Sequence, residues 1–103
     1  MLNILRLIQG DVFELNITIL DYDKVPEIEE MYFSCLEENI IKKFEKVTEN
    51  EFYMVIPSAE TKSFVPNITN FDVTVKFFDG EDLTFLFEGK IEILKKRNKI
   101  GRN

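Results

Sequence analysis

The side chains of this sequence that could do chemistry are mostly carboxylates, and they gather in two short stretches. The first holds Asp21, Asp23, Glu27, Glu29 and Glu30, and the second holds Asp79, Glu81 and Asp82. A hard cation such as Ca²⁺ needs several oxygen ligands that converge from a shaped loop. The first stretch has only one Asp-x-Asp pair and no calcium-loop pattern. We interpret both stretches as solvated turns and predict no metal site.

No catalytic group stands out elsewhere in the chain. Glycoside hydrolysis uses a pair of carboxylates, but no pair among the nineteen acidic residues is marked by an apolar pocket or an aromatic platform. The chain has no His, the side chain that most often titrates near neutral pH. Its single Cys35 lies in an alternating apolar pattern and is predicted to be a small buried hydrophobic residue. We expect no enzymatic activity and no cofactor.

Charge is spread unevenly along the 103 residues. All nineteen acidic residues and eight of the thirteen basic residues precede residue 95, so residues 1–94 carry −11 and residues 95–103 carry +5. An acidic body repels nucleic acid phosphates and anionic membranes. No apolar run approaches the ~20 residues of a membrane span, and no secretory signal is visible. We expect one domain over 1–94, a flexible basic tail over 95–103, a cytoplasmic site of synthesis, and neither nucleic acid nor membrane as a partner.

Alternating apolar and polar residues predict a series of short strands joined by turns. The segment 40–47 also fits helical spacing, but we favour an edge strand with outward lysines. A short helical turn capped by Ser58 is predicted near 58–64, followed by a loop over 65–70. The remaining predicted strands cover residues 2–8, 12–20, 28–36, 51–56 and the two arms of a hairpin over 71–94.

The hairpin over 71–94 is predicted to fix the register of the sheet. Its turn is Asp79-Gly80-Glu81-Asp82, and Gly89 interrupts the apolar row of the second arm, where we expect a bulge or a close backbone approach. About seven strands with almost no helix predict an all-β fold, an antiparallel β-sandwich. The antibody-type pattern of paired cysteines with a Trp between them is absent. The residues expected to face inward are Phe71, Val73, Val75, Phe77, Leu83, Phe85, Phe87, Gly89, Ile91 and Ile93.

Several large side chains are predicted to lie on outer strand faces. Tyr32 and Tyr53 could stack on a sugar, contact a protein or simply cover the sheet. Four apolar residues are also expected on outer faces, namely Leu36, Phe78, Leu86 and Leu94. Either they turn inward at bulges or they form an association surface. The possible interface residues are Tyr32, Tyr53, Phe78, Leu86 and Leu94.

Two stretches of the chain carry a resemblance to a known family. The first runs Ile8-Gln9-Gly10-Asp11 through the alternating residues to Ile19, followed by the turn Asp21 to Pro26. The second runs from Phe71 to Leu94 and ends in Gly89-Lys90-Ile91-Glu92-Ile93-Leu94. Together they resemble the small immunoglobulin-like domains of tailed bacteriophages and prophages, and above all the N-terminal domain of phage baseplate upper proteins. The resemblance implies an immunoglobulin-like sandwich that assembles with other virion or prophage proteins, commonly as a homo-oligomer.

The leading hypothesis is therefore a non-enzymatic structural or assembly module of a phage or prophage particle, associated with the virion. The alternative is a carbohydrate-binding or adhesion-type sandwich, which requires an exposed platform of tyrosines.

Overall fold

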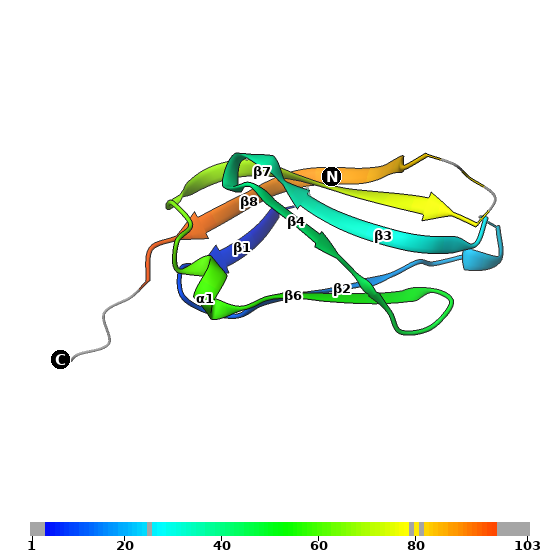
Figure 1. Ribbon diagram of the computed structural model, residues 1–103, viewed down its shortest axis with the longest axis horizontal. Coiled ribbons are helices and arrows are strands. Elements are labelled where there is room, and N and C mark those ends of the chain that lie inside the picture. Colours follow the sequence, from blue (N-terminus) through cyan, green and yellow to red (C-terminus); the bar gives the residue numbers. More distant parts are fainter. Residues whose placement is uncertain (1–3, 25, 79, 81, 97–103) are drawn as a thin grey trace.

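The protein is a sandwich of two β-sheets packed face to face (Figure 1). The computed structural model describes residues 4–24, 26–78, 80 and 82–96. The larger sheet has the strand order β1-β8-β7-β3-β4, and the smaller has the order β2-β6-β5. The strands are β1 (Ile4–Ile8), β2 (Phe13–Thr18), β3 (Ile28–Cys35), β4 (Ile40–Lys43), β5 (Glu45–Lys46), β6 (Glu51–Ile56), β7 (Asn67–Phe77) and β8 (Thr84–Leu94). Three helical turns join them: η1 (Tyr22–Lys24), η2 (Leu36–Glu38) and α1 (Ser58–Thr61).

The strand order is that of an immunoglobulin-like domain, so the predicted all-β sandwich is confirmed. In that fold one sheet contains strands B, E and D, and the other contains C, F and G, with an added C′ in variable-type domains. In chain order, β2-β6-β5 correspond to B-E-D, and β4-β3-β7-β8 correspond to C′-C-F-G. The first strand differs from the constant-type arrangement, because β1 lies beside β8 and not beside β2. Its pairing with β8 is parallel, whereas the other strand pairs are antiparallel.

The core forms where the alternating apolar residues of the two sheets meet. Met31, Phe33 and Cys35 on β3 point inward, as their period of two predicts. The Phe33 ring lies 5.4 Å from that of Phe71 and 6.2 Å from that of Phe13, centroid to centroid. Burying each such side chain contributes about 1.5–3 kcal/mol. The contact of Phe33 with Phe13 joins the two sheets, whereas Phe33 and Phe71 lie on neighbouring strands of the large sheet.

The segment 40–47 is extended, as predicted, but it forms two strands in different sheets. β4 pairs with β3 of the large sheet, and β5 pairs with β6 of the small sheet. Phe44 lies between them with 4% of its surface exposed, and its N–H donates to the Met31 carbonyl at 2.8 Å. The chain thus crosses from one layer to the other on this side of the sandwich (Figure 1).

The hairpin of β7 and β8 is present, but the prediction of its inward row was partly wrong. Gly89 pairs regularly with Phe71, and the register shift lies nearer the turn, where Val73 faces Phe87 and Thr74 faces Phe85. Leu86 is therefore the extra residue, and it packs against the core. Beyond this bulge the alternation reverses, and Phe85 and Leu83 are more than half exposed.

Two further local predictions were wrong. Residues 67–70 belong to β7 and not to a loop, because they pair with Lys90–Ile93 of β8 and Thr69 is buried in the core. The short helix is present, but Pro57 occupies the capping position, and Ser58 is the first helical residue with no side-chain cap. The predicted flexibility of the tail concerns residues 97–103, which lie outside the described residues, and so do residues 2 and 3 of the first predicted strand.

Candidate interaction surface

The two lateral sides of the sandwich differ in how their edge strands are covered. On the closed side, β4 and β5 are consecutive, and the chain between them covers the gap between the sheets. On the open side, β1 is the edge of the large sheet and β2 is the edge of the small sheet. No other strand of the described chain pairs with the outer edge of either one.

An apolar groove runs along the open side between β1 and β2. Its volume is about 340 Å³. The Phe87 ring meets Phe71 edge-on at a centroid distance of 6.1 Å, so the row of core phenylalanines extends to the groove. The lining residues are Ile4, Leu5, Leu15, Asn16, Ile17, Phe71 and Phe87.

The core residues of β2 are less well covered than those of the next strand. Phe52, Met54 and Ile56 on β6 expose 1–3% of their surface. Leu15 and Ile17, which face Met54 and Phe52 across the strand pair, are only half-buried. Because these residues belong to the inward row of the same sheet, their exposure comes from the unpaired edge. The hydrophobic core is therefore incomplete on the open side.

β2 also lacks the features that normally protect an edge strand. Natural edges are blunted by short length, bulges, Pro or outward Lys. β4 ends in Lys42-Lys43, β5 has two residues, and β1 carries Arg6 at its centre. β2 has six residues in regular register and no Lys, Arg or Pro. Its one charge, Glu14, accepts a hydrogen bond from the Tyr53 hydroxyl at 2.5 Å.

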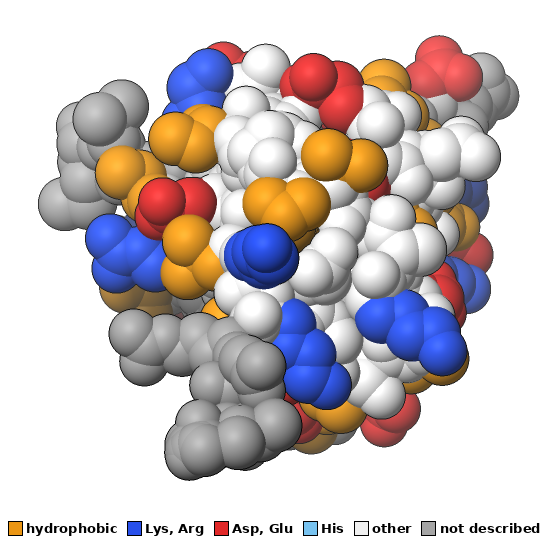
Figure 2. Space-filling model, turned by 90° about the vertical axis from the view of Figure 1, so that its left-hand side faces the viewer, with side chains coloured by type: hydrophobic (Ala, Val, Ile, Leu, Met, Phe, Trp, Pro, Cys, Tyr) orange, Lys and Arg blue, Asp and Glu red, His pale blue; other side chains and the backbone are white. Residues whose placement is uncertain are grey.

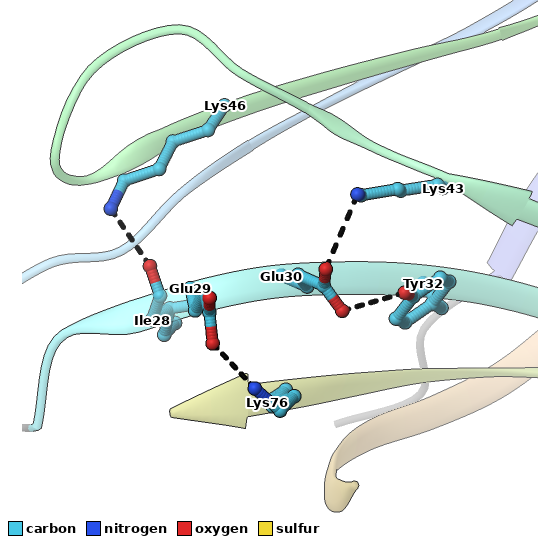
Figure 3. Close-up of polar contacts among 7 residues, drawn as sticks. All are labelled: Ile28, Glu29, Glu30, Tyr32, Lys43, Lys46 and Lys76. Atoms are coloured by element: carbon cyan, nitrogen blue, oxygen red, sulfur yellow. Dashed lines mark hydrogen bonds and ion pairs between the residues drawn. The ribbon is translucent and has the colours of Figure 1, made fainter. Parts of the chain in front are cut away.

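Ion pairs hold the closed side (Figure 3). Lys46 of β5 donates to the Ile28 carbonyl at 2.8 Å and pairs with Glu27 at 3.1 Å, which ties the small sheet to the large one. Glu30 of β3 accepts from the Tyr32 hydroxyl at 2.7 Å and from Lys43 at 3.3 Å. The hydroxyl of Tyr32, and then Lys43, hold the pKa of Glu30 below its ordinary value.

The carboxylates of the first acidic stretch are paired with lysines. Glu29 pairs with Lys76 at 2.5 Å, and that hydrogen bond raises the pKa of the lysine. Glu27 and Glu30 also pair with lysines, so this stretch is more than a solvated turn. Within the described residues, no group of three or more His, Cys, Asp or Glu could hold a metal ion. In the second acidic stretch, Asp79 and Glu81 lie outside the described residues, and Asp82 is exposed.

The turn at Gln9-Gly10-Asp11, which carries part of the family resemblance, has a structural role. The Gln9 amide donates to the Phe64 carbonyl at 2.9 Å and accepts from the Lys96 N–H at 3.3 Å. The Gly10 N–H donates to the hydroxyl of the buried Thr61 at 3.1 Å, and that hydroxyl donates to the Asp11 carbonyl at 2.7 Å. Gly10 has φ of +86°, which glycine adopts without strain. The turn thus fixes β1 and β2, the two edges of the open side, against α1 and β8.

Tyr32 and Tyr53 do not form the row that stacking on a sugar would require. Tyr32 lies on the outer face of the large sheet, and Tyr53 lies on the outer face of the small sheet, so they point away from one another. Both are half-buried. Each hydroxyl donates to a carboxylate, and that bond raises the pKa of both tyrosines. The platform on which the carbohydrate hypothesis depended is absent from these two positions.

The other predicted interface residues are also dispersed. Phe78 follows β7 at the turn end of the hairpin, is 55% exposed, and lies under Lys46 Nζ at 5.1 Å from its ring centroid. Leu94 ends β8 at the opposite end and is half-buried. Leu86 turns inward at the bulge, and Leu36 is 69% exposed in η2. The five predicted residues, Tyr32, Tyr53, Phe78, Leu86 and Leu94, do not form one surface.

The end of the sandwich that holds α1 has a mixed surface. Figure 2 looks onto this end and shows apolar side chains in small groups between Lys, Arg, Asp and Glu. An open pocket of about 440 Å³ lies here. It is lined by Gln9, Gly10, Ser58, Ala59, Lys62 and Lys96. Both lysines are exposed, so the pocket is a solvated depression.

Cys35 is buried, as predicted. It exposes 3% of its surface, and burial raises the pKa of its thiol, which keeps it unreactive at neutral pH. None of the helices in the described part of the chain has the length and apolar character to cross a membrane.

Comparison with known proteins gives no assignment: no family model and no curated protein matches the chain. The groove and the β2 edge are features that the sequence prediction missed. One signal was available, because residues 12–20 contain a single charged residue and no Lys. The position of β2 at an edge, however, depends on the pairing of β1 with β8, which the sequence pattern does not reveal.

Proposed function

We propose that the chain is a non-enzymatic structural or assembly module of a phage or prophage particle, which binds other proteins through its open side. The observation that carries the association role is the incomplete core at the groove between β1 and β2. Leu15 and Ile17 occupy inward positions yet remain only partly buried beside an unpaired edge. An extended strand added there would hydrogen-bond to the edge and cover these side chains.

The particle context rests on the resemblance to phage immunoglobulin-like domains. An immunoglobulin-like strand order is compatible with it, but many unrelated proteins share that architecture. The net charge of −6 favours protein partners over nucleic acid or anionic membranes. We propose other virion or prophage proteins as partners and the virion as the location. The carbohydrate-binding alternative has no supporting platform at Tyr32 and Tyr53, and we do not carry it further.

The test is incorporation into particles. Particles from the source strain are purified by density-gradient sedimentation, and the chain is quantified in them by mass spectrometry. We expect it in the particle fraction at a fixed ratio to the other structural proteins. An Ile17→Lys variant should be lost from that fraction because a charge then lies in the groove. A matched Val55→Lys variant, on the outer face of β6, should be retained. A chain found only in the free protein fraction would remove the particle role.

A further inference from the structure

The β2 edge shows what kind of strand it fits. Its outward side chains are Glu14, Asn16 and Thr18, and its inward side chains are apolar. A complementary strand must therefore be apolar on the inner face and uncharged or basic opposite Glu14. β2 itself meets both requirements, because its inward residues are apolar and Glu14 is its single charge.

Residues 12–20 read almost the same in both directions about Asn16. In an antiparallel pair of two β2 strands centred on Asn16, inward residues meet inward residues, as the pleat requires. The pairs are Leu15 with Ile17, Phe13 with Ile19, Glu14 with Thr18, and Asn16 with Asn16. No two like charges oppose one another within β2, whereas the same operation on β1 would place Arg6 against Arg6.

Two exposed residues outside β2 support the same centre. Val12 is 56% exposed and Leu20 is 80% exposed, and they flank the two ends of the strand. In the pairing centred on Asn16, Val12 of one copy lies opposite Leu20 of the other. The pairing thus gathers the most exposed apolar residue of the described chain with an exposed apolar partner.

We infer that the open side is an interface between two copies of this chain, in which the β2 strands pair antiparallel about a two-fold axis at Asn16. The two three-stranded sheets then form one continuous sheet, and the two apolar grooves face each other. This inference rests on the proposed use of the open side for association and names a second copy as the partner. A single strand pair buries less than the ~1,600 Å² of a standard interface, so the dissociation constant is expected on the order of micromolar.

The association should strengthen as salt is added. Each copy carries a net charge of −6, and added salt screens the repulsion between the two bodies. The paired strands contribute no ion pair that salt would weaken. An interface built from ion pairs would show the opposite dependence.

The experiment measures mass against concentration by sedimentation equilibrium, from about 1 μM to about 1 mM. We expect a shift from one to two copies. Asn16→Lys and Asn16→Asp each place two like charges opposite one another and should weaken the dimer at least about tenfold. An equimolar mixture of the two variants should recover it. Val55→Lys, one strand away on the same face, is the matched control and should leave the dimer unchanged.

The register has its own test. Thr18→Lys faces Glu14 of the second copy in this pairing and should tighten the dimer, whereas Thr18→Glu should loosen it. If Asn16→Lys tightens the dimer, the pairing is centred elsewhere and the inference is overturned. All these positions are exposed, so the folded state of each variant can be verified by circular dichroism.

The outcomes separate this inference from the proposed function. A protein that stays monomeric at every concentration overturns the inference. If Ile17→Lys still abolishes incorporation into particles, the open side then binds a different protein and the assembly role stands. A dimer that behaves as described, in a chain absent from particles, overturns the particle role alone.

Discussion

The open and closed sides of this sandwich are built from the same number of edge strands but treat them differently. On the closed side the chain passes directly from β4 to β5, Phe44 fills the gap, and Lys42, Lys43 and Lys46 bond to glutamates. On the open side β1 and β2 leave an apolar groove, and β2 carries no basic residue. The edge strands of the closed side have the features that prevent association, and on the open side β2 lacks them. The contrast places the stabilising ion pairs on one side, and our proposal places the association surface on the other.

The largest expected difference between the two sides is in how much a core residue of each contributes to the free energy of unfolding. Phe44→Ala removes a ring that is 4% exposed and should lower the free energy of unfolding by about 3–5 kcal/mol. Leu15→Ala on the open side removes a partly buried side chain and should cost about 1 kcal/mol in the monomer. Urea unfolding at low protein concentration measures both. Equal losses would contradict the difference between the sides.

The next largest loss of stability is expected at the turn Gln9-Gly10-Asp11, which holds the edge strands β1 and β2 in place. Thr61→Val keeps the shape of the side chain but removes the hydroxyl that accepts from Gly10 and donates to Asp11. The partly buried N–H of Gly10 then loses its partner, at a cost of about 1 kcal/mol. Thr61→Ser, which retains the hydroxyl, is the control. If Val and Ser variants unfold at the same urea concentration, the hydroxyl does not fix this turn.

A smaller loss is expected from the ion pair that ties the sheets on the closed side. Lys46→Met removes the bonds to Glu27 and Ile28 and the cation over the Phe78 ring. Because these groups are partly exposed, the cost should be about 0.5–1 kcal/mol. Lys90→Met, which removes an exposed hydrogen bond to Asn70, should change stability very little. A larger loss of stability in Lys90→Met than in Lys46→Met would show that Lys46 does not tie the two sheets together.

Acid should weaken the fold through two carboxylates outside the open side. Hydrogen bonds from Tyr32 to Glu30 and from Thr69 to Glu37 lower the pKa of both glutamates in the folded chain. Their stabilisation is present at neutral pH and is lost as the pH falls below about 4.3 and through the folded-state values. Urea midpoints measured across the acid range should fall, and they should fall less in Glu30→Gln and Glu37→Gln. An unchanged slope in both variants would remove these groups as the cause.

Local alternation was enough to predict the strands with regular inward rows. The predicted inward residues of β6, and of β3 from Met31 to Cys35, match because period two and burial agree there; before Met31, β3 has a register shift between Ile28 and Glu30. The sequence did not reveal the bulge at Leu86, because the alternation of Leu83, Phe85 and Phe87 looks regular until the opposite strand is known. The strand over 67–70 was missed for the same reason: polar residues with turn character are held extended by β8.

The candidate site was harder to predict than the fold. Apolar residues on outer strand faces predicted an interface. The bulge at Leu86 and the separation of the two sheets place these residues on different surfaces. The groove depends on which strands lie at the edges, and that is a property of long-range pairing. Only the lack of basic residues in 12–20 was visible beforehand.

Amide hydrogen exchange as a function of protein concentration tests the contrast between the two sides most directly. Alternate amides of an edge strand point away from its one neighbour. At concentrations that favour the dimer, the amides of β2 that point away from β6 should become protected, and dilution should remove that protection. The amides of β4 that point away from β3 should exchange at the same rate throughout. Exchange from β2 that does not depend on concentration, or protection that appears at β4 instead, would contradict the account.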